Sequence, residues 1–310
     1  MTASTAAWDL PMLLGLSADI RRVEVVLADW AATADAEMRP MIDRQLAGRA
    51  KSYRPATVFA CYRAIADDAP RDSIVRSAAA VELVHNVSLI VDDILDRSRY
   101  RRGVLALHCR YGFLPALMTS GYISFGASAL VSDDAYSVRL IAELMQRLGA
   151  AECVQWRVRR KPLGVEDWRA IAGEDTGSMF EICARLGTRD DRLRRFGRLL
   201  GILYHGCDDL ADVRGTVALG GGSERDLLDG ILTLPAALAI RDPRAAALFA
   251  SVRPGDAERF QERLVASLDD AERYLDGLAV AAIAEARGQS DHPDRLVELV
   301  DYTRELSSSE

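Results

Sequence analysis

Lysine and asparagine are almost absent from this chain of 310 residues. Lysine occurs only at Lys51 and Lys161, and Asn86 is the only asparagine. The chain therefore cannot form an Asn-Gly hairpin, because Asn86 is followed by valine. Since nearly every cation is an arginine, a lysine that falls inside a motif is informative.

Cysteine is scarce, and the cysteines do not lie close together in pairs. Five cysteines are scattered along the chain, and no two of them form a Cys-x-x-Cys pair. An odd number without close pairs disfavours a disulfide framework or a structural zinc site. The cysteine content predicts a reducing, cytoplasmic environment.

Basic residues are fewer than acidic residues, which gives a formal net charge of −7. This charge argues against a nucleic-acid partner. No basic residue precedes Arg21, so we expect no secretory signal. The uncharged run 111–132 contains glycine, proline, serine and threonine, and we interpret it as a buried helix, not a membrane span.

Apolar residues recur at intervals of three and four along almost the whole chain, which predicts helices. The predicted helical segments are 10–26, 56–66, 74–96, 139–160, 165–186, 192–212, 226–240, 256–287 and 293–306. No stretch alternates cleanly as a strand would. The sequence therefore predicts an all-α fold of about ten helices in a single domain, 1–310, with residues 1–15 and 307–310 frayed.

Six Asp-Asp pairs occur, and two of them differ from the others. Asp92-Asp93-Ile94-Leu95-Asp96 and Asp208-Asp209-Leu210-Ala211-Asp212 both have the form DDxxD, and each follows an apolar helical stretch. Residues four apart share one helix face, so the outer aspartates of each motif can grip one hard cation together. Magnesium accepts one or two carboxylates and completes its shell with water and phosphate oxygens. Two such helices that face each other would hold magnesium ions around a diphosphate. The alternative is a pair of capped or salt-bridged helix ends.

Cationic residues flank the first motif. Arg101 and Arg102 follow it within a short turn, where they can bind phosphate oxygens. Lys51 and Arg54 lie at a predicted helix start, and His85 lies two turns before Asp92 on the same face. His85 is either a ligand or an ordinary core histidine.

The ordered motifs resemble those of the trans-isoprenyl diphosphate synthases, the polyprenyl synthetase family. The segments that carry the resemblance are 81–96 with Arg101-Arg102-Gly103, Leu107-His108, Tyr111-Gly112, Glu152 with Gln155, 176–180, 204–212, and 226–235. The resemblance runs from about residue 48 to residue 306. It implies the isoprenoid synthase helical bundle with a central apolar cavity, in a homodimer.

The resemblance also implies a reaction and its residues. An allylic prenyl diphosphate would condense head to tail with isopentenyl diphosphate, and the apolar helices would exclude water from the allylic cation. The implied catalytic residues are Asp92, Asp93, Asp96, Asp208, Asp209, Asp212 and Arg101. Magnesium, three ions in number, would bind Asp92, Asp96, Asp208 and Asp212. The implied substrate-binding residues are Lys51, Arg54, His85, Arg101, Arg102, Gln155, Thr176 and His205.

Several positions depart from the family pattern. The lysine that precedes Thr176 in the family is Asp175 here, and the lysine of its Gly-Lys-x-Thr segment is Ile231. The glutamine three residues before the second motif is His205, and the histidine before the first motif is Val91. The two lost lysines belong to the allylic half of the site, whereas Lys51 and Arg54 of the isopentenyl half are retained.

Two other functions remain open. A terpene cyclase derived from the family would act on a preformed prenyl diphosphate, and a regulatory subunit would support a second synthase chain. The six retained aspartates favour a working synthase over a subunit.

The residues before the first motif predict the length of the product. Neither Val87 nor Ser88, about one turn before Asp92, is aromatic, so the prenyl tail is not blocked there. We expect a product of twenty carbons or more, with Tyr122 and Phe125 closing the pocket deeper down.

Overall fold

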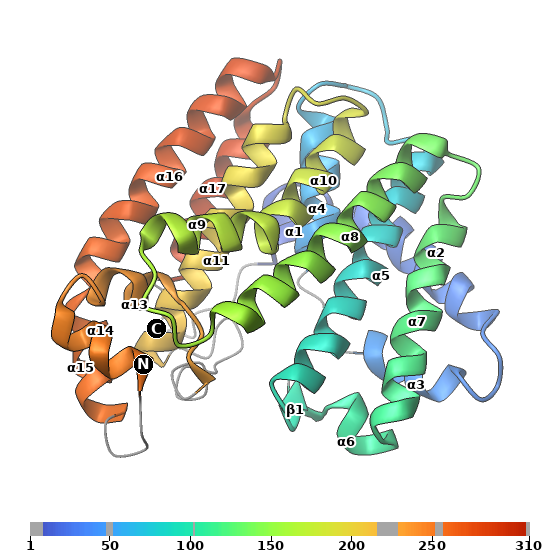
Figure 1. Cartoon of the computed structure of the whole chain (residues 1–310). Coiled ribbons are helices and arrows are strands. Elements are labelled where there is room, and N and C mark those ends of the chain that lie inside the picture. Colours follow the sequence, from blue (N-terminus) through green and yellow to red (C-terminus); the bar gives the residue numbers. More distant parts are fainter. Residues whose placement is uncertain (1–8, 48–51, 102, 216–228, 252–256, 308–310) are drawn as a thin grey trace, which may run out of the picture. The chain divides into compact units, whose positions relative to one another are not determined.

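The computed structural model describes residues 9–47, 52–101, 103–215, 229–251 and 257–307 (Figure 1). Its contacts divide the chain into two compact units. Unit 1 comprises Met1–Glu143 and Cys183–Asp191, and unit 2 comprises Leu144–Ile182 and Arg192–Glu310. The single domain over 1–310 stays a prediction.

Unit 1 consists of helices and one short hairpin. Its elements are α1 (Leu10–Leu13), α2 (Ser17–Ala32), α3 (Arg39–Leu46), α4 (Tyr53–Arg63), α5 (Asp72–Leu95), β1 (Tyr100–Arg101), β2 (Val104–Leu105), α6 (Leu107–Tyr111) and α7 (Phe113–Leu130). Two further helices, α8 (Ala135–Val158) and α10 (Thr176–Thr188), have residues in both units.

Helix α5 forms the core of unit 1 and carries the first acidic motif at its end. It begins after Pro70 and packs against α2, α4 and α7. Its alanines allow these neighbours to approach closely, and Ala78, Ala79 and Ala80 are fully buried. Because apolar side chains surround the helix for most of its length, the carboxylates at its end are anchored on a rigid element.

Unit 2 is entirely helical over its described residues. Its remaining helices are α9 (Val165–Glu174), α11 (Arg194–Arg214), α13 (Leu234–Ala239), α14 (Pro243–Ala250), α15 (Ala257–Ala266), α16 (Leu268–Gln289) and α17 (Asp294–Glu305). Helix α11 carries the second acidic motif and packs against α9, α13, α16 and α17 (Figure 1). It ends at Gly215, whose φ of 72° is the left-handed conformation that closes many helices.

The all-α prediction is confirmed, with differences in detail. The predicted helix 165–186 is interrupted at Asp175, which separates α9 from α10, and 256–287 is interrupted at Ser267. The predicted turn at 101–104 contains the antiparallel pair β1–β2, where Gly103 has a φ of 79°. Short helices such as α1, α3 and α6 raise the number above the expected ten.

Both ends that are predicted to fray contain packed residues. Leu10 and Leu14 are each only 2% exposed, so apolar burial holds this part of the N-terminal segment. Ser307 is fully buried, and its carbonyl accepts a hydrogen bond from Arg214. The predictions for residues 1–8 and 308–310 lie outside the described residues.

The uncharged run 111–132 forms a helix as predicted, but it is not buried all round. Helices α5 and α7 are both long and apolar enough to cross a membrane by length and composition. The apolar window of α5 is 78% buried, whereas that of α7 is only 33% buried. One side of α7 exposes large apolar side chains, namely Phe113, Leu114, Leu117, Met118, Tyr122 and Phe125.

A buried ion-pair network joins the helices of unit 2. Glu181 of α10 is fully buried and pairs with Arg147 at 3.0 Å, Arg194 at 2.8 Å and Arg198 at 3.3 Å. Burial by itself would raise the pKa of Glu181, but the hydrogen bonds and charges of Arg147 and Arg194 outweigh it and hold the pKa below its usual value. The ionised carboxylate therefore links α8, α10 and α11.

We expect Glu181→Gln to lower the free energy of unfolding by about 3 kcal/mol at pH 7, because it removes the fully buried anion that three guanidinium groups share. A carboxyl whose pKa is lowered on folding stabilises the fold above its unfolded pKa and loses that contribution as the pH falls. The difference between wild type and variant should therefore shrink from pH 7 to pH 4 in urea unfolding. Glu262→Gln, at an exposed position of α15, is the matched control. A loss of the same size at both pH values contradicts the prediction.

Candidate functional site

The first acidic motif lies at the C-terminal end of α5. Asp92 and Asp93 belong to the last turn, and Asp96 caps it, with the Asp96 amide donating to the Asp92 carbonyl at 2.8 Å. The helical spacing of Asp92 and Asp96 is therefore retained across the cap. Asp93 is buried, whereas Asp92 and Asp96 are half-buried.

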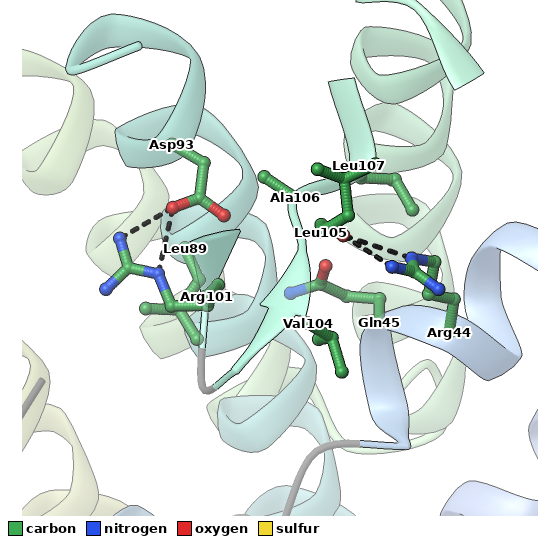
Figure 2. Close-up of a pocket in the computed structure, with 9 residues that line it drawn as sticks. All are labelled: Arg44, Gln45, Leu89, Asp93, Arg101, Val104, Leu105, Ala106 and Leu107. Carbon is green, nitrogen blue, oxygen red and sulfur yellow. Dashed lines mark hydrogen bonds and ion pairs between the residues drawn. The ribbon is translucent and has the colours of Figure 1, made fainter. Parts of the chain in front are cut away.

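Arg101 binds the buried member of this motif. Its Nε and Nη2 atoms lie 2.8 Å and 2.7 Å from Asp93 Oδ1, as Figure 2 shows. Burial raises the pKa of Asp93, and the Arg101 charge opposes that rise only in part. Arg101, expected at the allylic diphosphate, is thus held on β1 by a residue of the first motif.

Two residues of α3 line the same small pocket (Figure 2). Arg44 donates from Nε and Nη2 to the Leu105 carbonyl at 3.1 Å and 2.7 Å, which anchors β2 to α3. Gln45 donates to the Asn86 carbonyl at 3.3 Å. The pocket is small, with a volume of about 30 Å³. No sequence motif marked Arg44 or Gln45.

The second acidic motif lies in the last two turns of α11. Asp209 is buried, and its Oδ2 accepts hydrogen bonds from Trp168 Nε1 and from the Leu234 amide, both at 2.8 Å. Burial raises the pKa of Asp209 to about 8 despite these two donors. Trp168 of α9 is a partner of the second motif that the sequence reasoning missed, because a buried tryptophan within a helical pattern carries no distinguishing signal.

The two motifs repeat one arrangement. In each, the middle aspartate is buried and is bonded by protein donors, Arg101 for Asp93 and Trp168 for Asp209. The outer aspartates of both motifs are half-buried. The protein itself therefore satisfies the middle carboxylates, and the outer ones reach the surface of their unit.

The outer carboxylates suit a hard divalent cation. Each motif offers two oxygen ligands at helical spacing, which is the share of a magnesium shell that proteins usually supply. Among the described residues, no three histidine, cysteine or carboxylate side chains form a ready-made metal cluster. Ions at these motifs would complete their coordination with water or phosphate oxygens.

Thr176 and His205 lie together beside the second motif. His205 Nδ1 is 2.9 Å from Thr176 Oγ1 and 3.6 Å from Asp175 Oδ2. The helices that carry them are in backbone contact, because a Cβ on Gly201 would lie 2.6 Å from the Gly177 Cα atom. These two glycines therefore allow the start of α10 to lie against α11.

The position of the second lost lysine is next to an arginine. Ile231 follows Gly230, whose carbonyl accepts a hydrogen bond from the Arg160 amide at 2.8 Å. A Cβ on Gly230 would lie 2.3 Å from Arg160 Cγ, so the arginine side chain fills the space that glycine leaves open. No sequence pattern indicates this contact, since the two residues are far apart in the chain.

The remaining predicted ligands are divided between the units. Arg54 on α4 is half-buried and His85 on α5 is 6% exposed, both in unit 1, whereas Gln155 on α8 belongs to unit 2 and is half-buried. Lys51 and Arg102 lie outside the described residues. The first motif belongs to unit 1 and the second to unit 2, so their predicted meeting around a diphosphate stays a prediction.

The predicted pocket residues differ in burial. Val87 is 6% exposed, and half-buried Ser88 donates from its hydroxyl to the His85 carbonyl of its own helix. Tyr122 packs against Trp30 with ring centroids 6.2 Å apart. Phe125 is 79% exposed, so within unit 1 it does not close an interior pocket, because that stretch of α7 turns it to the surface.

Comparison with known proteins gives consistent similarities. A family model described as "Polyprenyl synthetase" matches residues 35–264. The chain is 27% identical to the nonaprenyl diphosphate synthase of Mycobacterium tuberculosis, over 95% of this chain and 94% of that protein. These matches span the two acidic motifs and nearly all of the predicted ligands.

Solved structures agree with the fold. The heptaprenyl diphosphate synthase of Staphylococcus aureus superposes with a TM-score of 0.85 at 22% identity, covering 94% of this chain and 98% of that one. A polyprenyl synthase from Caulobacter crescentus, solved in complex with calcium and isoprenyl diphosphate, gives 0.85 at 25% identity, with coverage of 98% and 99%.

Removal of the Arg101 side chain should destabilise unit 1, because the buried Asp93 carboxylate then lacks its cation. We expect Arg101→Gln to lower the free energy of unfolding by about 2 kcal/mol, and Asp93→Asn to restore part of this loss in the double variant. Denaturant unfolding of the four proteins of this cycle measures the coupling. Arg99→Gln, exposed in the same loop, is the control. Strictly additive losses argue against the pairing.

Proposed function

Because the chain belongs to the polyprenyl synthetase family, we propose that it is a prenyltransferase that joins an allylic prenyl diphosphate head to tail to isopentenyl diphosphate. The observation that carries this proposal is the repeated motif on α5 and α11, two outer aspartates at helical spacing around one buried aspartate. A single such helix end is common, whereas two with the same arrangement support a common task.

The outer aspartates Asp92, Asp96, Asp208 and Asp212 would hold magnesium, for which we propose three ions. When bound, these ions would neutralise the diphosphate and make it a better leaving group. The buried Asp93 and Asp209 act by holding Arg101 and the Trp168–Leu234 region in place. Arg101, once turned from Asp93 toward a phosphate, can bind it in the same two-donor fashion.

The isopentenyl end is assigned to Lys51, Arg54, His85 and Arg102. The two that are described, Arg54 and His85, both belong to unit 1. Gln155, Thr176 and His205 of unit 2 are assigned to the allylic substrate. The apolar body of α5 supports the exclusion of water from a reactive allylic cation, because its residues before the motif are almost entirely buried.

The exposed side of α7 supports a homodimer. Its large apolar residues recur at helical spacing, with Leu114 63%, Met118 52% and Phe125 79% exposed. A contiguous apolar stripe of this kind marks an interaction surface. We propose that a second copy of the chain covers it and that no membrane span is involved. A mass in solution of twice the chain is the corresponding expectation.

A cytoplasmic location is also proposed. All five cysteines are free thiols, and Cys61, Cys183 and Cys207 are buried. Burial raises the pKa of the Cys207 thiol to about 12. Free cysteines without disulfides fit a reducing compartment.

The deciding assay uses the purified chain with magnesium and isopentenyl diphosphate, plus dimethylallyl, geranyl, farnesyl or geranylgeranyl diphosphate in turn. Longer prenyl diphosphates are the expected product. Hydrocarbons formed from one prenyl diphosphate would identify a cyclase. Inertness that is relieved by a partner chain would identify a regulatory subunit.

Asp92→Ala and Asp208→Ala should each reduce kcat by about 100-fold or more, because each removes a carboxylate from a proposed ion site. Steady-state kinetics at saturating magnesium measures the effect. Asp269→Ala, at an exposed Asp-Asp pair of α16, is the matched control and should leave kcat unchanged. Retained turnover in either motif variant removes that motif from the metal site.

Product length should respond to Val87, which is buried on α5 about 7.5 Å before Asp92 along the helix. We expect a wild-type product of twenty carbons or more, and Val87→Phe should shorten it because the ring occupies the path of the tail. Chromatography of the dephosphorylated products measures chain length. Val280→Phe, at a position of α16 that is 69% exposed, should leave it unchanged. A wild type that stops at fifteen carbons, with no change on Val87→Phe, refutes this assignment.

A further inference from the structure

Three polar side chains of unit 2 form a hydrogen-bonded chain beside the second acidic motif. His205 Nδ1 lies 2.9 Å from Thr176 Oγ1, and the Thr176 hydroxyl donates to Asp175 Oδ2 at 3.5 Å. On the other side of the ring, His205 Nε2 lies 4.0 Å from Asp209 Oδ1. The imidazole thus lies between Asp175 and the motif, one helical turn before Asp209.

The carboxylate at the end of this chain sets the direction of its hydrogen bonds. An ionised carboxylate only accepts, so the Thr176 hydroxyl donates to Asp175 and its oxygen accepts from the Nδ1–H of His205. The neutral imidazole then carries its lone pair on Nε2, on the side of Asp209. A lysine at position 175 can only donate and would impose the opposite direction.

Asp175 is itself fixed between two helices. Its amide donates to the Ile171 carbonyl of α9 at 2.9 Å, and its own carbonyl accepts from the Ser178 hydroxyl of α10 at 2.9 Å. The contact between Gly177 and Gly201 fixes the start of α10 against α11. The carboxylate therefore has a defined place relative to the ring that it orients.

We propose, resting on the proposed function, that Asp175 is a positioning residue that acts through Thr176 to fix the ring and tautomer of His205 in the allylic half of the site. Asp175 and His205 then replace the lysine and glutamine of the family as one unit. Asp175 alone brings a negative charge toward a site for an anionic substrate. The Thr176 hydroxyl links this carboxylate to the His205 ring by hydrogen bonds, so each residue depends on the other.

Nitrogen-15 NMR of the histidine side chains tests the positioning without any substrate. The chain has four histidines, and loss of one signal in His205→Gln identifies His205. We expect the wild type to carry the proton on Nδ1 and Asp175→Asn to shift the tautomer, because an amide can donate to the Thr176 oxygen, whose hydroxyl can then donate to Nδ1. Glu166→Gln, which removes an exposed carboxylate of α9, is the control and should leave the signal unchanged. A His205 signal that is the same in Asp175→Asn and wild type overturns the proposal.

A double-mutant cycle tests whether the two residues act as one. We expect Asp175→Asn to lower kcat/KM for the allylic diphosphate about tenfold, with the KM of isopentenyl diphosphate unchanged. In the His205→Gln background the same substitution should have no further effect. The double variant D175K/H205Q, which restores the family pair, should exceed both D175K and H205Q in activity. Additive losses, or equal changes in both KM values, contradict a shared allylic role.

The two levels of the claim fail separately. If the wild type extends no allylic primer, the proposed function is wrong, yet the NMR measurement still decides whether Asp175 orients His205. If the wild type makes longer diphosphates and the cycle is additive, only the inference about Asp175 and His205 is wrong.

Discussion

Carboxylates at the ends of apolar helices are the constraint on which the rest of this molecule depends. An aspartate beside a buried helix is costly unless a cation or a hydrogen-bond donor compensates it. The chain meets that cost for Asp93 and Asp209 with its own groups, a guanidinium in one unit and an indole with a backbone amide in the other. The outer aspartates are left half-buried, where ions and phosphate oxygens can reach them.

This division of labour explains why the two motifs use different donors. Asp93 is bound by a charged residue of the adjoining hairpin. Asp209 is bound by neutral donors, and burial raises its pKa to about 8 despite them. The bonds of Asp209 thus join α9 and the start of α13 to α11.

The sequence was a good guide to helices and motifs and a poor one to contacts. Periodicity and the DDxxD spacing predicted α5, α11 and the grouping of Asp92 with Asp96, because these depend on residues close in the chain. These patterns could not distinguish the buried middle aspartate of each motif from the half-buried outer ones. They also could not identify Trp168 or Arg44, because the contacts of these residues join distant segments of the chain. The uncharged composition of α7 predicted that the helix is buried. Its exposure depends on which elements pack against each of its sides, and composition does not show that. The break at Asp175 was hidden because the apolar pattern continues across it.

Departures from a family pattern are informative when they lie together in space. Asp175 and His205 are far apart in the chain and would count as two separate losses in an aligned sequence. Because they are in contact through Thr176, the two differences form one change. The family pair places a hydrogen-bond donor, lysine, at position 175, whereas this chain places an acceptor, aspartate, there. The loss at Ile231 has a different character, since the Arg160 side chain lies against Gly230, the residue before it. Position 175 thus belongs to a hydrogen-bonded group with Thr176 and His205, whereas position 231 adjoins an arginine from a distant part of the chain.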